Sequence, residues 1–259
     1  MTRFNRLPII NYSLEEALIR VKENWYNLKF IKDQTEEICL AAVRENGYAL
    51  EYVKNQTENI CLTAIKENPN ALQYIKNQTE NICLAAIKKD WDALAYVEDQ
   101  TDYICLVAVK KNTYALRFVD NKTESICLES VKKFGLNLRY VEEQTDSICL
   151  TAIKENPNAL QYVKNQTESI CLEAVKEYAD TLRYVEEQTE SICLEAVKQY
   201  GCVLKYVDNQ TDSICLEAVK KNGIALRFVE KQTKEICFAA VKQDRNALQY
   251  VLDKSIFED

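Results

Sequence analysis

The sequence predicts an all-α fold, an α-solenoid built from 22-residue two-helix repeats, and three observations lead to it. A threonine and, four residues later, a cysteine return every 22 residues, from Thr35 and Cys39 to Thr233 and Cys237. Between these marks, apolar residues recur at helical spacing. The chain also has only four glycines and three prolines, which disfavours folds made of strands and tight turns. A fixed period of this length is typical of stacked helical repeats.

The first part of each unit predicts a helix of about ten residues. Counting the threonine as place one, its hydroxyl can accept from the free N–H groups of the first turn. An acid follows at place two in nine of ten units, Lys234 being the exception, and a lysine or arginine stands at place ten in every unit. These charges suit the positive and negative ends of a helix dipole. Places four, five, eight and nine carry Ile, Cys, Ala and Val or Ile, which form one apolar face.

The pattern breaks at places twelve and thirteen, where a second and shorter helix of about seven residues is expected to begin. Asn68-Pro69 and Asn156-Pro157 place a capping asparagine before a proline that favours the first helical position. Alanine, leucine and valine or isoleucine then point inward, and place eighteen is Tyr or Phe. A 3₁₀ turn or an irregular segment is the alternative form of this second element.

The repeats define the domain organisation. Residues 1–12 form an N-terminal extension, and residues 13–34 form a degenerate N-terminal capping repeat in which Glu16 and Ala17 replace Ile-Cys. Residues 35–254 hold ten tandem repeats, and residues 255–259 form a C-terminal tail. We predict a single continuous domain, because each unit buries its apolar face against its neighbours. Several apolar residues of the extension are expected to cover the open end of the stack: Phe4, Leu7, Pro8, Ile9 and Ile10.

Ten of the eleven cysteines stand in register at place five, and we interpret them as small buried packing residues. Equivalent cysteines of adjacent repeats are expected to lie too far apart for disulfides. Cys202 falls outside the register at an outward place, so we predict an accessible thiol there. Unpaired thiols predict an intracellular, reducing compartment. No apolar run reaches the length of a membrane span, so no membrane partner is expected.

Catalytic and metal-binding patterns are missing from the sequence. The chain has no histidine, which removes the Ser-His and Cys-His pairs and most zinc sites. It also has neither a GxGxxG motif nor a P-loop. The carboxylates fall on predicted solvent faces. We therefore expect no enzyme activity, no metal and no cofactor.

Candidate binding residues stand at the variable places of the first helix. Places three, seven, ten and eleven are predicted to lie opposite the buried face, and we expect the first helices to line a concave side. The N-terminal half offers an apolar anchor, and the C-terminal half offers a row of acids; together they predict a bipartite groove. The candidates are Ala85, Tyr103, Val107, Glu129, Glu173, Glu195 and Glu217. A solvated surface is the alternative interpretation of the charges.

Two further rows have competing interpretations. The aromatic row at place eighteen predicts packing between repeats, and the alternatives are stacking of bases or binding of a proline-rich peptide. The basic row at place ten predicts helix termination and pairing with acids, and the alternative is contact with phosphates. The second helices of the C-terminal half add Arg117, Arg139, Arg183, Lys205 and Arg227 at place seventeen, on a different face.

These features predict a non-enzymatic scaffold that mediates protein–protein interaction through its concave surface. The acid row suits a basic segment of a protein or peptide partner. The net charge of −7 disfavours an extended nucleic-acid partner. A helical repeat that binds single-stranded nucleic acid, one nucleotide per unit, remains an alternative. A self-assembling structural protein is the third candidate.

Two segments carry a resemblance to a known family: NQTENICLAAIK at residues 77–88 and NPNALQYVKNQTESICLEAVK at residues 156–176. They resemble a helical-repeat family of unknown function. That family is multiplied in the amoeba-infecting giant DNA viruses, Mimivirus and its relatives, with related repeats in amoeba-dwelling bacteria. The likeness covers residues 35–254. It implies a helical-repeat protein of a host cytoplasm or viral factory, and it brings no catalytic residue.

Overall fold

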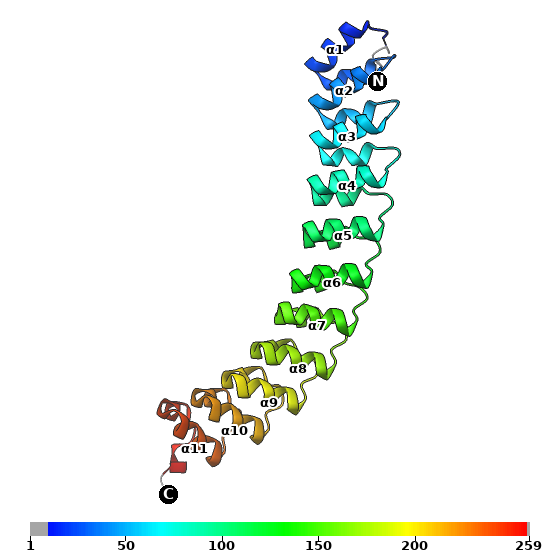
Figure 1. The fold of residues 1–259 in the computed structure, drawn as a ribbon. Coiled ribbons are helices and arrows are strands. Elements are labelled where there is room, and N and C mark those ends of the chain that lie inside the picture. The colour runs from blue at the N-terminus through cyan, green and yellow to red at the C-terminus, as the bar shows by residue number, and fades with distance from the viewer. Residues whose placement is uncertain (1–9, 258–259) are drawn as a thin grey trace, which may run out of the picture. The chain divides into compact units, whose positions relative to one another are not determined.

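A computed structural model describes residues 10–257, and each 22-residue unit within them forms one α-helix followed by one 3₁₀ helix (Figure 1). The α-helices are ten residues long: α1 (Leu14–Glu23), α2 (Glu36–Glu45), α3 (Glu58–Glu67), α4 (Glu80–Lys89), α5 (Asp102–Lys111), α6 (Glu124–Lys133), α7 (Asp146–Glu155), α8 (Glu168–Glu177), α9 (Glu190–Gln199), α10 (Asp212–Lys221) and α11 (Lys234–Gln243). The 3₁₀ helices have six residues, except for the short last one: η1 (Trp25–Phe30), η2 (Gly47–Tyr52), η3 (Pro69–Tyr74), η4 (Trp91–Tyr96), η5 (Thr113–Phe118), η6 (Gly135–Tyr140), η7 (Pro157–Tyr162), η8 (Ala179–Tyr184), η9 (Gly201–Tyr206), η10 (Gly223–Phe228), η11 (Arg245–Tyr250) and η12 (Lys254–Phe257).

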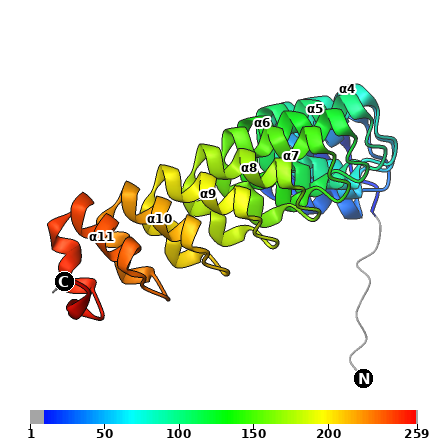
Figure 2. The same cartoon turned by 90° about the horizontal axis from the view of Figure 1, so that it is seen from below.

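The predicted all-α repeat solenoid is confirmed. Within the described residues the extended backbone pairs only at an isolated bridge between Ile10 and Ile31. The chain divides into two compact units, Met1–Glu129 and Ser130–Asp259. In the second unit, α8 to α11 lie side by side in chain order (Figures 1 and 2).

The caps at both helix starts follow from the residues predicted to make them. The Thr145 hydroxyl accepts from the Ile148 N–H at 3.3 Å and so opens α7. Asn156 then takes an extended conformation, φ −147° and ψ 107°, which ends the α-helix. Its side-chain oxygen accepts from the Asn158 N–H at 3.0 Å, and Pro157 occupies the first position of η7. One residue therefore stops the first helix and starts the second.

The second element is a six-residue 3₁₀ helix, not the seven-residue helix expected first, so the alternative form is the correct one. Extended residues stand at both of its ends, Asn156 and Val163 in the case of η7. Six residues leave little room for i to i−4 hydrogen bonds, whereas bonds to i−3 close earlier. The Ala159 N–H reaches the Asn156 carbonyl at 2.8 Å, and the Val163 N–H reaches the Leu160 carbonyl at 3.0 Å.

Within each of the two compact units, the core lies between the two helices of one repeat and those of the next. The predicted apolar face is confirmed: Ile170, Cys171, Ala174 and Val175 of α8 are all buried, and so is Leu182 of η8. Within each compact unit, α-helices pack against neighbouring α-helices, as α8 does against α9, and 3₁₀ helices against neighbouring 3₁₀ helices, as η7 does against η8. Neither layer can exclude water alone, so stability depends on adjacent repeats.

The glutamine at place twenty-two joins one repeat to the next. The Gln166 side-chain amide donates to the carbonyl of Leu160 at 3.5 Å, in its own repeat, and to that of Tyr184 at 2.8 Å, in the next. Its oxygen accepts from the Glu186 N–H at 3.0 Å and from the Cys171 thiol at 3.5 Å. The donation to the carbonyl at place eighteen of the next repeat recurs at Gln34, Gln56, Gln78, Gln100, Gln144, Gln188, Gln210 and Gln232. We name this set the glutamine clamp.

Lys122 takes the place of the clamp glutamine in one repeat. The Cys127 thiol that follows it donates to the Lys122 main-chain carbonyl at 3.6 Å. The thiol at place five thus keeps an acceptor when the glutamine oxygen is absent, since the backbone supplies one.

Hydrogen bonds within the N-terminal capping repeat explain why its residues depart from the repeat pattern. Glu16 and Ser13 form a reciprocal capping box: the Glu16 N–H donates to the Ser13 hydroxyl at 3.3 Å, and the Ser13 N–H donates to the Glu16 carboxylate at 3.1 Å. Ile10 pairs with the end of this repeat, because its N–H reaches the Phe30 carbonyl at 3.0 Å. The remaining apolar residues of the extension lie outside the described residues: Phe4, Leu7, Pro8 and Ile9.

The glycines of this protein allow close packing of the backbone, and none of them adopts an unusual backbone angle. No residue in the described part of the chain has a positive φ. A Cβ added to Gly47 would lie 2.5 Å from the Ala64 carbonyl oxygen of the next repeat. The absent side chain therefore lets the start of η2 approach the backbone of α3.

Leu160→Ala is expected to destabilise the protein by about 2–5 kcal/mol, because Leu160 is fully buried and its loss leaves a cavity. The denaturant midpoint of unfolding measures the effect. Gln161→Ala, at the exposed neighbouring position, is the matched control and should leave the midpoint nearly unchanged. Equal midpoints for the two variants would contradict the assigned core.

Gln166→Ala should lower the free energy of unfolding by about 1–3 kcal/mol, because two carbonyls and one N–H lose a partner together. The control is Asn165→Ala, the exposed residue just before it in the link. Chemical denaturation of both variants gives the comparison. If they lose the same stability, the glutamine is only part of a turn and the clamp has no energetic role.

Candidate functional site

The apolar candidates lie on two neighbouring helices of the first compact unit, residues 1–129. Ala85 belongs to α4, and Tyr103 and Val107 belong to α5, which packs against α4. Tyr103 is 57% exposed, whereas Ala85 and Val107 are half-buried. The structure therefore shows one protruding ring beside small apolar side chains. Glu129 of α6 is half-buried.

The acidic candidates lie on three consecutive helices of the second compact unit, residues 130–259. Glu173, Glu195 and Glu217 belong to α8, α9 and α10, and each helix packs against the next. All three are half-buried, so the prediction that place seven lies opposite the buried face is only partly correct. Place seven follows buried place four by three residues, which sets both on one side of the helix. The glutamates are thus held at the flank of the packed face; we name the three the acid row.

One member of the acid row pairs with the basic residue one turn on. The Lys220 ammonium lies 3.1 Å from the Glu217 carboxylate, with the two side chains 59% and 36% exposed. An ion pair this exposed typically adds less than about 1 kcal/mol to stability. The acid row therefore does little for folding through such pairs.

The cations at place seventeen lie over the aromatic rings that follow them. The guanidinium carbons of Arg139, Arg183 and Arg227 are 4.7, 4.8 and 4.4 Å from the ring centroids at place eighteen. Such distances give favourable cation–π contacts. Some of the rings at place eighteen also meet a ring of the preceding repeat, as in the Trp91–Phe118 pair at 6.1 Å and the Tyr48–Tyr74 pair at 5.9 Å. These contacts agree with the prediction of packing between repeats.

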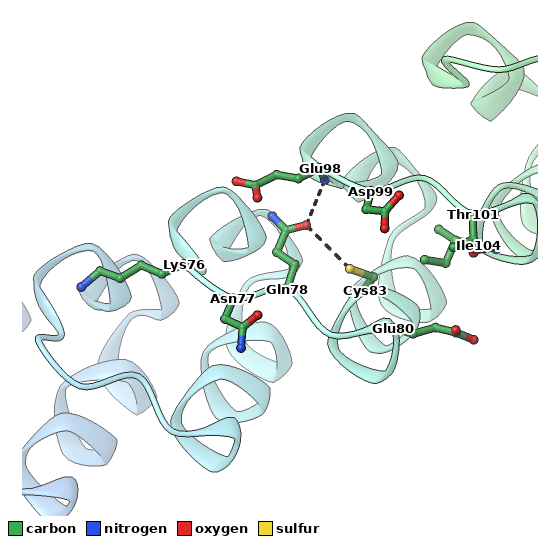
Figure 3. Close-up of a pocket in the computed structure, with 9 residues that line it drawn as sticks. All are labelled: Lys76, Asn77, Gln78, Glu80, Cys83, Glu98, Asp99, Thr101 and Ile104. Carbon is green, nitrogen blue, oxygen red and sulfur yellow. Dashed lines mark hydrogen bonds between the residues drawn. The ribbon is translucent and has the colours of Figure 1, made fainter.

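A polar hollow of about 290 Å³ opens beside the clamp residue Gln78 (Figure 3). The Gln78 oxygen accepts from the Glu98 N–H at 3.1 Å and from the Cys83 thiol at 3.7 Å. Glu80 and Asp99 also line this hollow. Across the described residues, no group of three His, Cys, Asp or Glu side chains is arranged to hold a metal ion.

The thiols fall into two environments. All ten in-register cysteines are buried, as predicted. Burial, reinforced by the charges of Glu186 and Glu168, raises the pKa of Cys171 to about 11. Cys202 is half-buried, so its predicted outward position is only partly correct. It sits at place fourteen, where the next repeat covers it: the Asn222 side-chain amide lies 3.3 Å from its sulfur.

Sequence reasoning missed two tyrosines at place twelve. Tyr178 and Tyr200 are 47% and 50% exposed and line a hollow of about 230 Å³ in the second unit. The available signal was the aromatic residue at a place where most repeats carry a capping residue: Asn46, Asn68, Asp90, Asn112, Asn156, Asn222 and Asp244.

Native thiol labelling should separate the cysteines. The Cys202 thiol should react with a disulfide reagent at neutral pH, whereas the ten buried thiols should react only on unfolding, because burial and a raised pKa suppress the thiolate. Absorbance of the released product measures both phases. Cys202→Ser should abolish the native phase alone. Rapid native labelling of most cysteines would contradict the buried arrangement.

The repeats of this chain match a known protein family. A family model described as Domain of unknown function (DUF4116) matches residues 57–100, 123–166, 167–211 and 212–254. Each match covers about two of the 22-residue units, and together the matches cover well over half of the chain. Neither a curated protein nor a solved structure matches it. None of the described helices has the length and apolar character needed to cross a membrane. The chain belongs to the family described as Domain of unknown function (DUF4116).

Proposed function

We propose that this protein is a non-enzymatic scaffold that binds a basic segment of a protein or peptide partner along α8, α9 and α10. The observation that carries the proposal is the acid row. Three glutamates occupy one place on three consecutive packed helices. A partner with basic side chains at a matching spacing would meet them in register.

The environment of the acid row suits recognition. Each glutamate is half-buried and belongs to a packed helix, so a rigid element carries a side chain that is still partly open to solvent. Such placement lowers the ordering cost of binding. Complementary charge mainly speeds the encounter and sets specificity. A site that contributes little to folding is free to serve a partner.

The first unit supplies a second candidate surface. Tyr103 projects from α5 beside Val107, and Ala85 lies on the neighbouring α4. Tyrosine is enriched in protein interfaces because a rigid ring buries much area at low entropic cost. We propose this patch as an apolar anchor for a protein partner.

Binding of single-stranded nucleic acid is the second candidate. The cations at place seventeen are exposed and repeat along the 3₁₀ helices, as Arg139 and Arg183 do. They lie over the rings that would have to stack bases, which favours the protein-binding proposal. A gel shift decides between the two, because nucleic-acid affinity falls steeply with salt. Self-assembly is the third candidate, tested by the oligomeric state in solution.

The proposed setting is a reducing compartment inside a cell. Eleven free cysteines, ten of them buried, suit such a compartment. The resemblance to the repeats of amoeba-infecting giant viruses supports a host cytoplasm or viral factory as the place where the partner is found. Affinity capture from such cells, followed by mass spectrometry, identifies that partner.

Reversing the acid row with Glu173→Lys, Glu195→Lys and Glu217→Lys should leave the melting temperature nearly unchanged and abolish partner capture. The matched control reverses Glu186, Asp208 and Glu230, which are exposed acids of the same three repeats at place twenty. Both triple variants change the net charge equally. Capture should survive in the control. Undiminished capture by the acid-row variant, or equal loss in both, would show that no specific site lies there.

A further inference from the structure

Tyr178 and Tyr200 replace a capping residue in two consecutive repeats. In most of the other repeats, the residue at this place caps the 3₁₀ helix with its side chain: Asn156 accepts from the Asn158 N–H and Asn222 from the Ile224 N–H, both at 3.0 Å. The tyrosines make no such bond. The two repeats therefore lack a favourable contact that most repeats make, as do the repeats with Asp90 and Phe134 at this place.

Packing buries only about half of each ring. The rings of Tyr178 and Tyr200 are about half exposed, so roughly half of their surface stays in water. Phe134, the other aromatic residue at place twelve, is less exposed. Two half-exposed rings at equivalent places of adjacent repeats favour a role in binding a ligand over a role in stabilising the fold.

The hollow that these rings line is acidic. Its six lining residues include the acids Glu177 and Asp180, and the Tyr178 hydroxyl donates to the Asp180 carboxylate at 3.5 Å. The second Asp180 oxygen, Oδ1, is buried without a partner. The same oxygen is unpartnered on Asn70, Asp92 and Asn158, so its burial belongs to the repeat. What distinguishes Asp180 is a negative charge beside two open tyrosine rings.

The wall of the hollow is fixed by the backbone of α8. The Gln199 side-chain amide donates to the carbonyls of Val175 at 3.0 Å and Lys176 at 3.1 Å. This amide holds the end of α8 against α9, and the two tyrosines follow directly after these helices. The site is therefore built on packed elements and needs little ordering when it binds.

The hollow lies at the ends of α8 and α9, two of the helices that carry the acid row. Glu173 and Glu177 are four residues apart on α8, as Glu195 and Gln199 are on α9, so each pair shares one face of its helix. A chain that binds along the acid row would thus reach the tyrosines at one edge.

We infer that this hollow receives a lysine or arginine side chain of the basic segment, held by the faces of Tyr178 and Tyr200 and by the carboxylates of Asp180 and Glu177. Aromatic faces attract cations, and nearby carboxylates complete the charge balance. A volume of about 230 Å³ leaves room for one such side chain. This inference rests on the proposed function, because it assigns an anchor residue to the same partner.

The test measures fluorescence anisotropy with a labelled peptide of alternating arginine and serine. Tyr178→Asn with Tyr200→Asn restores the asparagine of neighbouring repeats, so the variant should melt no lower than the parent protein. Its dissociation constant should rise about tenfold, the size of a desolvated cation–π contact. Tyr178→Phe with Tyr200→Phe keeps both rings and should bind within about twofold of the parent. A peptide with citrulline in place of arginine, similar in shape but uncharged, should bind far more weakly.

The outcomes distinguish the tyrosine anchor from the proposed binding along the acid row. Unchanged affinity in the asparagine variant, or equal binding of the citrulline peptide, overturns the anchor; so does a parent protein that does not bind the arginine peptide. If the asparagine variant binds normally while the acid-row reversal weakens binding, the anchor fails and the proposed function stands. If the asparagine variant alone loses affinity, the hollow binds the cation and the acid row does not contribute.

Discussion

The stack is held in register by a glutamine that satisfies backbone groups of two repeats at once. A 3₁₀ helix flanked by extended residues leaves carbonyls and N–H groups without helical partners, and these groups lie at the joint between units. Gln188, for example, donates to the Leu182 and Tyr206 carbonyls and accepts from the Asp208 N–H. Because one side chain supplies all three bonds, neighbouring repeats fit together in one register. The apolar layers add most of the stabilisation but are less directional.

Much of the fold could be predicted from the sequence because its determinants are local. Thr145 as a cap and Asn156 as a breaker identify the ends of α7, and the spacing of Ile148, Cys149 and Ile153 identifies its buried face. The form of the second element could not be predicted in the same way. Apolar spacing over six residues fits either hydrogen-bond pattern, and the extended residues at both ends decide in favour of 3₁₀. The role of Gln166 was also hidden, since its partner carbonyl at Tyr184 lies 18 residues further along the chain.

The candidate site was predictable in location more than in detail. Tyr103 is exposed as its place in the repeat suggested, but Glu195 is half-buried, because a periodic pattern does not show how far a neighbouring helix covers a flank. Cys202 differs for the same reason, since its cover, Asn222, comes from the next repeat. Tyr178 and Tyr200 stood at a turn, where variation is usually read as neutral. Their significance depends on the cap that they fail to make and on the hollow beside them.

The ordinary backbone of these repeats has a consequence for how such a chain changes over generations. No described residue needs a left-handed conformation, so the turns impose few demands that only glycine meets. Most repeats begin at a threonine cap and end at a link whose bonds fit the next repeat of the same kind. Unequal recombination between two copies would then add or delete whole modules while every new junction resembled an existing one. The length of the array and the order of its surface residues can thus diverge faster than its framework.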